Sequence, residues 1–317
     1  MEGIYRFGAF VVIGLTLAGC DDVSSQAMNG TDSSGQDNEP PNQEAVAALV
    51  QKTMDNLVFV EGGSFQMGDF GPIDPKAGGL PYSPYSDNKP LHEVTLDSYS
   101  ISAYQVSYAD FDIYTEATGQ PRINTEGFEV EYRAPDVPAG VDWYQARDYC
   151  QWLADQTGLP FALPTEAQWE YAARSRGQFL PLATNDGYIR RGENYPSREE
   201  IIASTPSPHV GPQTIGLIPP NPLGVYQMGL NGFEWVNDWY SEDYYDVSPE
   251  VNPTGPESGD LKVLRGTDFG EGNRSNLVIN RRKRTPDLFY DDPRGLTDHS
   301  AYRVNTARCS LNLKDKL

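Results

Sequence analysis

The sequence predicts a single domain of mixed helices and short strands with much irregular structure, on three observations. The chain has 317 residues, and after a polar N-terminal stretch no second linker-like segment divides it, which favours one large domain. Segments with strand-like alternation and segments with helical spacing follow one another, and no internal repeat is present. The 30 glycines and 25 prolines predict that irregular connections hold much of this domain.

The first twenty residues have the features of a bacterial lipoprotein signal. Arg6 precedes an apolar run over residues 7–17, and the chain then reads Leu-Ala-Gly-Cys up to Cys20. The run is too short for a membrane span, which needs about 20 apolar residues. We therefore expect residues 1–19 to be removed as a signal peptide, and lipid on Cys20 to anchor the chain at the periplasmic face of a membrane. Asp21 resembles a signal that keeps enteric lipoproteins in the inner membrane, and inner or outer membrane stays open.

Two segments connect this predicted anchor to the domain. Residues 20–43 are rich in Ser, Asn, Gln, Gly and Pro, and they predict a disordered tether. Residues 44–56 carry Ala, Leu and Met at mixed helical spacing and predict a short helix. The domain itself is expected over residues 57–317.

The charge of the chain limits its classes of partner. Twenty-four basic and 45 acidic side chains give a formal net charge of -21, and such a surface repels nucleic acid and anionic lipid headgroups. We therefore expect no nucleic-acid partner. Two interpretations of the acidity stay open: a well-solvated periplasmic surface, or a docking face for a basic partner.

Within the domain, four segments predict particular elements. Residues 90–96 alternate apolar and polar side chains like a half-buried strand. Residues 104–118 predict a helix that the following glycine ends. A second helix is expected after Trp143, and a third after Thr165, an N-cap with Gln168 in the capping-box position. One face of the second helix carries Ala146, Tyr149, Cys150 and Leu153.

Ordered segments along the chain match those of a known family. They are residues 59–68, 90–96, 163–174, 219–228, 231–235, 238–240, 252–256, 263–266, Arg284 and 302–304. Together and in this order, they resemble the formylglycine-generating enzyme family, the sulfatase-modifying-factor domain. The resemblance covers about residue 58 to residue 304. It implies an α+β fold of short elements, formylglycine-generating-enzyme-like and related to C-type lectins.

The resemblance also implies that the family's oxidase chemistry is absent. The family oxidises a substrate cysteine with copper held by two thiolates, which are the soft ligands that this ion prefers. Laying the family's Arg-Gly-Gly-Ser segment on residues 265–269 places Glu271 and Asn276 at the two thiol positions. Asp268 then replaces the serine, and Phe233 replaces a Trp of the Trp-Glu-Trp motif. We expect a degenerate site without catalytic residues and without copper.

Two branches of the superfamily leave an enzymatic alternative. Iron-dependent sulfoxide synthases use three histidines, whereas His92, His209 and His299 are widely separated here and are interpreted as structural. A relative that oxidises a pyoverdine chromophore lacks the cysteine pair. By that resemblance, Glu271 is a candidate general base of a cysteine-independent oxidase or modifying enzyme.

A structural calcium site is a further implication of the resemblance. Its four positions correspond to Gln227, Leu230, Gly232 and Glu234. Side-chain and backbone oxygens are ligands that suit Ca²⁺, although Gln227 replaces a shorter or charged ligand. The alternative for Glu234 is a buried carboxylate satisfied by backbone donors.

Two cysteines remain once Cys20 is acylated, Cys150 and Cys309. In an oxidising compartment two thiols suggest one disulfide. Some relatives have a disulfide at the position of Cys150, with the partner at the position of Val304, five residues before Cys309. A redox pair is the alternative, but neither thiol has a second cysteine nearby in the sequence.

Export, lipid and lost chemistry together predict binding instead of turnover. Among relatives, similar lipoproteins are encoded beside type VI secretion lipase effectors and resemble immunity proteins. We therefore expect a non-catalytic periplasmic lipoprotein that neutralises a partner protein, a type VI lipase (phospholipase) effector. The acidic and aromatic residues 238–245 and 287–294 are the candidate contacts. A structural accessory lipoprotein of a secretion or gliding apparatus is a further alternative.

Overall fold

The computed structural model describes residues 42–267, 269, 276–287 and 304–317. The predicted signal peptide, Cys20 and nearly all of the predicted tether lie outside this range. The described residues belong to one structural unit. No helix among them has the length and apolar character that crossing a membrane requires.

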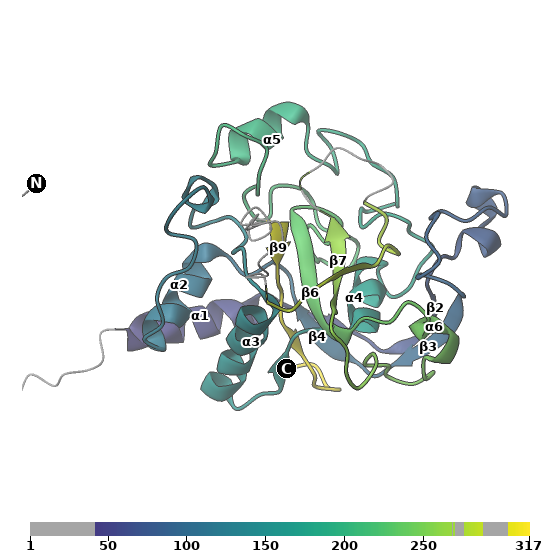
Figure 1. Ribbon diagram of the computed structural model, residues 1–317, viewed down its shortest axis with the longest axis horizontal. Coiled ribbons are helices and arrows are strands. Elements are labelled where there is room, and N and C mark those ends of the chain that lie inside the picture. Colours follow the sequence, from purple (N-terminus) through teal and green to yellow (C-terminus); the bar gives the residue numbers. More distant parts are fainter. Residues whose placement is uncertain (1–41, 268, 270–275, 288–303) are drawn as a thin grey trace, which may run out of the picture. The chain divides into compact units, whose positions relative to one another are not determined.

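Short helices and short strands are interspersed along this domain (Figure 1), which confirms the predicted α+β class. The helices among the described residues are α1 (Gln43–Asp55), α2 (Tyr108–Ala117), α3 (Trp143–Thr157), α4 (Glu166–Ala173), α5 (Arg198–Ser204) and α6 (Tyr244–Val247), with the 3-10 turns η1 (Gly71–Ile73), η2 (Pro75–Ala77) and η3 (Glu129–Tyr132). The strands are β1 (Leu57–Val60), β2 (Gly63–Met67), β3 (His92–Leu96), β4 (Tyr99–Ser102), β5 (Phe161–Ala162), β6 (Gly232–Trp239), β7 (Lys262–Thr267), β8 (Arg282–Arg284), β9 (Asn305–Thr306) and β10 (Ser310–Leu311).

The strands pair into three sheets in the described part of the chain. One has the order β1-β4-β10-β5, another has the order β8-β7-β6-β9, and β2 pairs with β3. In the second sheet β6 runs antiparallel to β7 and parallel to β9. Gly232 lies opposite Thr267. The start of β6 and the end of β7 are therefore neighbours.

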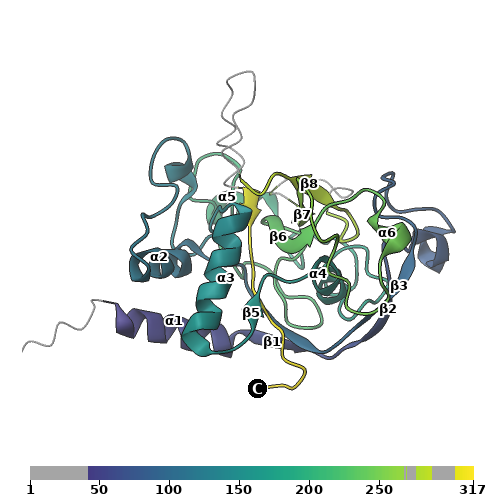
Figure 2. The ribbon, with the colours of Figure 1, turned by 60° about the horizontal axis from the view of Figure 1, so that its bottom comes forward.

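The β6–β7 pair separates two hydrophobic cores. Trp235 and Leu264 belong to the core that α1, α2 and α3 cover, whereas Val236 and Val263 belong to the core beneath β2, β3 and α4. Successive side chains of a strand point to opposite faces, so each strand supplies both cores. Figures 1 and 2 agree, since both show α1 to α3 on one side of this sheet and the β2–β3 pair on the other.

Local capping explains where the helices begin. The predicted helix 44–56 is confirmed as α1. The capping box of Thr165 and Gln168 is confirmed at α4, and Asp142 forms a second one at α3. The start predicted at residue 104 is wrong for α2, because the Ser107 hydroxyl accepts the Asp110 N–H at 3.2 Å and so fixes the first turn.

The predicted disulfide joins Cys150 of α3 to Cys309, which precedes β10. Their Cα atoms are 5.7 Å apart, across a sequence separation of 159 residues. Both cysteines are buried in the core that α1, α2 and α3 cover. The bridge therefore ties the C-terminal strand to the helical side of the domain.

Candidate functional site

The positions where the sequence predicts degenerate chemistry lie at the start of β6 and beyond the end of β7. Phe233 lies opposite Gly266 in the β6–β7 ladder and opposite Asn305 in the β6–β9 ladder. Its ring is partly buried and packs against the core that α1, α2 and α3 cover. Asp268 and Glu271 lie outside the described residues, so their predicted roles stay predictions.

Asn276 is a structural link within the described site. Its Nδ2 donates to the Tyr195 hydroxyl at 2.9 Å and to the Gly229 carbonyl at 3.0 Å. The cavity beside it measures about 10 Å³, which is the smallest space that holds one water molecule. With these two hydrogen bonds and so little space beside it, Asn276 is placed as a structural residue of the interior.

The cysteines that the structure describes do not fit the copper ion that enzymes of the resembled family use. The chain has three cysteines, and the two that the structure describes form the disulfide. Copper(I) needs soft ligands such as paired thiolates. The Asn276 position offers an amide in place of a thiolate, so no step of a copper reaction is assigned to this chain.

Glu234, the side chain expected to bind calcium, pairs instead with a buried arginine. Arg308 Nε donates to Glu234 Oε2 at 2.7 Å, and Arg308 Nη2 donates to Oε1 at 2.7 Å. Trp169 Nε1 donates to Oε2 at 2.7 Å, and Gln105 Nε2 to Oε1 at 3.1 Å. Both carboxylate oxygens are therefore occupied by side-chain donors, and the charge is neutralised by a guanidinium.

Gln227, another expected calcium ligand, has its oxygen occupied as well. Gln227 Oε1 accepts the Gly216 N–H at 2.7 Å, and the Gln227 backbone carbonyl accepts the Leu230 N–H at 3.1 Å. A calcium ion would have to displace these donors and Arg308. The positions Gln227, Leu230, Gly232 and Glu234, as they lie here, do not fit Ca²⁺. The alternative of a satisfied buried carboxylate fits Glu234, but with side-chain donors where backbone donors were expected.

Arg308 itself was missed by the sequence analysis. Its guanidinium also donates to the backbone carbonyls of Ser102, Ala103 and Tyr226, at 2.9 to 3.1 Å. It thereby joins β4, the loop before β6 and the C-terminal segment. The only sequence signal is a basic residue directly before the bridged Cys309.

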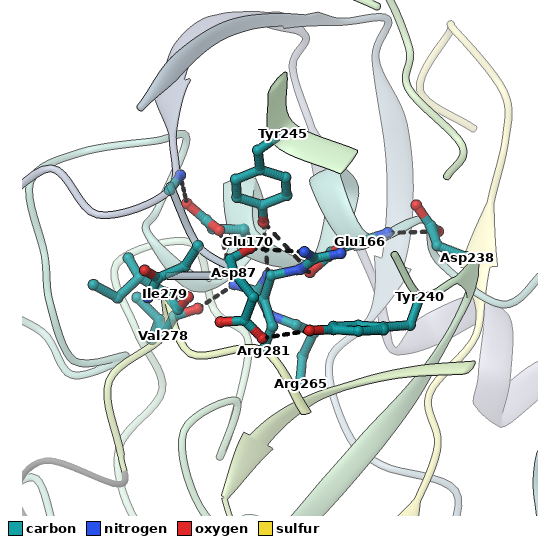
Figure 3. A network of polar contacts seen from close by, with 12 residues as sticks. Asp87, Glu166, Glu170, Asp238, Tyr240, Tyr245, Arg265, Val278, Ile279 and Arg281 are labelled. Atoms are coloured by element: carbon teal, nitrogen blue, oxygen red, sulfur yellow. Dashed lines mark hydrogen bonds and ion pairs between the residues drawn. The ribbon is translucent and has the colours of Figure 1, made fainter. Parts of the chain in front are cut away.

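A second buried ion cluster connects α4 to β7 and to the segment before β8 (Figure 3). Arg265 donates to Glu166 Oε1 at 2.7 Å and to Glu170 Oε2 at 2.8 Å. Arg281 donates to both oxygens of Glu166, at 2.8 and 3.0 Å. Arg174 donates to Glu170 Oε1 at 2.8 Å. We call Glu166, Glu170, Arg174, Arg265 and Arg281 the buried ion cluster.

The electrostatics of the cluster follow from burial and pairing. Burial alone would raise the pKa of Glu166, but Arg281 and Arg265 hold that pKa below its ordinary value. At neighbouring Asp238, burial and then the charge of Glu166 outweigh the charges of Arg281 and Lys262 and raise the pKa to about 8. Its Oδ2 accepts the Glu166 N–H at 2.9 Å. These contacts lock α4 in place, and we assign them a structural role.

Residues 238–245 were predicted as candidate contacts with a partner, and the structure places some of them inside the domain and others, Glu242 and Asp243, at the surface. Asp238, Tyr244 and Tyr245 are buried. The Tyr245 ring packs 4.5 Å from the Arg281 guanidinium and 4.6 Å from the His92 ring. These three buried side chains support the domain from within, and the role of the segment in contacts stays a prediction. Of the second predicted segment, 287–294, only Asp287 is described.

The packing of His92 fits the structural interpretation, which stays a prediction for the other two histidines. His92 lies in β3 against Tyr245, and His209 is exposed beyond α5. His299 is outside the described residues. In the described ranges, no group of three or more His, Cys, Asp or Glu side chains could hold a metal ion.

Comparison with known proteins gives a consistent result. The Sulfatase-modifying factor enzyme 1-like domain matches residues 42–293. The formylglycine-generating enzyme of Streptomyces coelicolor is 30% identical over 274 residues, which cover 73% of this chain and 84% of that enzyme. The inactive C-alpha-formylglycine-generating enzyme 2 of Bos taurus is 24% identical, over 75% of this chain and 85% of the relative.

Other similar proteins include a much longer kinase and proteins whose solved structures have a similar fold. Serine/threonine-protein kinase pkn1 of Chlamydia pneumoniae is 30% identical over 236 residues, which cover 68% of this chain but only 33% of the kinase. The structure of PvdO from Pseudomonas aeruginosa has a TM-score of 0.58 and 25% identity, covering 81% of this chain and 94% of that one. Treponema denticola variable protein 1 has a TM-score of 0.56 at 19% identity, with 81% and 95% covered.

Proposed function

Because the chain belongs to the family of the Sulfatase-modifying factor enzyme 1-like domain, we propose that it keeps the family fold for binding and has given up the family's chemistry. The observation that carries this proposal is the cysteine count. Of three cysteines in the chain, Cys150 and Cys309 are joined to each other and Cys20 lies in the lipoprotein signal. No thiolate pair is left for copper. A relative named as inactive supports loss of activity on a retained fold.

The bound partner is proposed to be a protein at the periplasmic face of the membrane, to which lipid on Cys20 anchors the chain. Our specific proposal is an immunity protein that neutralises a type VI secretion lipase effector. An inhibitor of a membrane-attacking lipase has to be present where the lipase acts, and the lipoprotein signal supplies that address. Inhibition then needs only a complementary surface.

The test is a competition assay between sister strains, combined with affinity purification of the full chain from membranes. We expect a strain without this chain to lose in competition with its parent, and a lipase to co-purify with the chain. Unchanged survival of the deletion strain and the absence of a stable protein partner would together reject the proposal.

Two substitutions separate binding from catalysis in the same assay. Glu271→Gln and Asp268→Asn remove the candidate acidic groups of the enzymatic alternative. We expect both variants to protect as well as the wild type does. Loss of protection at an unchanged melting temperature and unchanged partner binding would favour the cysteine-independent enzyme.

A further inference from the structure

The Arg308 guanidinium is surrounded by oxygen atoms from β4, β6 and the segment before β6. It makes five hydrogen bonds, two to the Glu234 carboxylate and three to the backbone carbonyls of Ser102, Ala103 and Tyr226, at 2.7 to 3.1 Å. A guanidinium has five N–H donors and no acceptor, so every donor of Arg308 is used. We call the Glu234 carboxylate and these three carbonyls the oxygen cage.

Burial makes this arrangement a neutral ion pair inside the protein. The side chains of Arg308 and Glu234 are 0% and 1% exposed. A buried pair is stable only where its remaining donors are also satisfied. Arg265 of the buried ion cluster falls short of this, because its Nε has no hydrogen-bond partner in the described part of the chain. The oxygen cage therefore fits its cation more completely than the buried ion cluster does.

The backbone around Arg308 is held by contacts that do not involve its side chain. Ala307 and Cys309, its two neighbours in the sequence, accept the N–H groups of Val106 and Ser102 at 2.8 and 2.9 Å. The disulfide also fixes Cys309 to α3. Substitution of Arg308 by a small residue should therefore leave the oxygen cage in place, around a cavity where the guanidinium was.

Gln105 can add one more oxygen to the cage. Its Nε2 donates to Glu234 Oε1 at 3.1 Å, while its Oε1 is buried and has no hydrogen-bond partner among the described residues. Rotation of the amide by half a turn exchanges these two atoms and brings the oxygen beside Glu234. Two carboxylate oxygens, one amide oxygen and three carbonyls then make six oxygens. Six to eight oxygens are the ligands that Ca²⁺ takes in proteins.

We propose that the oxygen cage is a cation site that the chain fills with its own Arg308 guanidinium, and that the cage binds Ca²⁺ when this guanidinium is removed. The ligands differ from those of the calcium site that the resemblance implies, since only Glu234 is common to both. The inference concerns ion binding and stability, and it does not depend on the proposed binding function.

Charge explains why a guanidinium, and not a metal ion, fills the oxygen cage of the wild-type chain. Glu234 is its one carboxylate, so a single positive charge neutralises it, whereas a divalent ion would leave a buried net charge. Arg308 is also attached to the chain and competes at a high effective concentration. Without the guanidinium, the buried carboxylate has no cation, and its charge and the carbonyl dipoles favour uptake of an ion.

The experiment measures Tb³⁺ and Ca²⁺ binding by the full-length Arg308→Ala variant. Tb³⁺ prefers oxygen ligands as Ca²⁺ does, and it luminesces when a nearby indole transfers energy to it. Trp169 Nε1 donates to Glu234 Oε2 at 2.7 Å, so an ion in the oxygen cage lies beside an indole. We expect a saturable luminescence signal beyond that of the wild type, and Ca²⁺ should displace it. Ca²⁺ should also raise the melting temperature of Arg308→Ala and leave that of the wild type unchanged.

Two further variants are the matched controls. Arg308→Lys keeps a positive charge beside Glu234, and its melting temperature should not respond to Ca²⁺. Arg308→Ala combined with Glu234→Gln keeps the cavity but removes the carboxylate, and it should lose both the additional luminescence and the Ca²⁺ response. Any Tb³⁺ bound elsewhere on this acidic chain contributes equally to the single and the double variant, so their difference reports on the cage.

Arg308→Gln, which keeps part of the side-chain volume, is measured in parallel and should respond to Ca²⁺ as Arg308→Ala does. If neither variant is stabilised by Ca²⁺, or if neither folds even in its presence, the oxygen cage is not a cation site and the proposal is overturned. Equal responses of Arg308→Ala with and without Glu234→Gln would overturn it as well. Stabilisation of the wild type by Ca²⁺ through Glu234 would mean that the guanidinium does not hold the cage against the ion, which also contradicts the proposal.

Discussion

The buried ion cluster and the site predicted to be degenerate meet on strand β7 but differ in how closely the described residues fit the pattern that the resemblance implies. Arg265 of β7 keeps every charged partner on α4, with Glu166 and Glu170 both within 2.8 Å. One residue further along, Gly266 lies opposite Phe233, where the resemblance expects a tryptophan of the active site. A buried charge without its partner is costly, whereas Phe233 and Asn276 find contacts inside the fold. The proposed loss of the family's chemistry is therefore compatible with keeping the fold.

Removal of Arg265 gives the sharpest test of this difference. Arg265→Met should destabilise the domain by about 3 to 5 kcal/mol, because Glu170 and Glu166 stay buried with fewer positive partners. Denaturant unfolding of the purified chain measures the loss. Arg190→Met is the control, since Arg190 forms only exposed pairs with Asp186 and Glu193, and its effect on stability should be far smaller. Equal effects of the two changes would contradict a special role of the buried ion cluster.

The disulfide provides the next largest effect, on the helical side of the molecule. The double variant Cys150→Ala with Cys309→Ala should lose about 2 to 5 kcal/mol, because the unfolded chain is no longer constrained across 159 residues. The same unfolding experiment measures it, and reduction of the wild-type chain should reproduce it. If the double variant unfolds at the wild-type denaturant concentration, the bridge does not contribute to stability.

Local signals of the fold could be predicted from the sequence, and distant pairings other than the bridge between Cys150 and Cys309 could not. The capping box of Thr165 and Gln168 is visible because both partners lie within four residues. Strand β7 gave no signal of its own, since all six of its residues are buried and no alternation results. The short elements and the overall architecture came from the ordered match to a family.

The same limit explains the errors at the candidate site. Asp238 looked like part of an acidic and aromatic contact segment, but its carboxylate accepts the N–H of Glu166, 72 residues away. Arg308 looked unremarkable, although it neutralises Glu234 across 74 residues. Burial of a charge depends on partners that are distant in the sequence. The residues that neighbour a charge along the chain do not reveal these partners.

The pH dependence of stability tests the electrostatics next to the buried ion cluster. The pKa of Asp238 rises from 3.8 to about 8 on folding, mainly through burial. Between these values the folded state holds a proton that the unfolded chain has lost, so stability should fall as pH rises. The slope from this group is at most about 1.4 kcal/mol per pH unit. Unfolding curves from pH 5 to 8 measure it.

Asp238→Asn should flatten this decline, because asparagine still accepts the Glu166 N–H and does not titrate. Lys262 affects stability at higher pH, between about 8 and 10.5, because burial lowers its pKa from 10.5 to about 8. There the unfolded chain holds the extra proton, and stability should rise with pH. A wild-type slope in the Asp238→Asn variant would show that another group causes the decline.

Added calcium is expected to have the smallest effect on stability. It tests whether the predicted calcium site around Glu234 still binds an ion. A structural ion present at a hundred times its dissociation constant would add about 2.7 kcal/mol of stability. We expect no such gain, because Arg308, Trp169 and Gln105 already donate to the Glu234 carboxylate. Melting curves with added Ca²⁺ and with a chelator should therefore coincide. A stabilisation by Ca²⁺ that Glu234→Gln removes would instead mean that the ion displaces the Arg308 guanidinium, and that this part of the family's site is still in use.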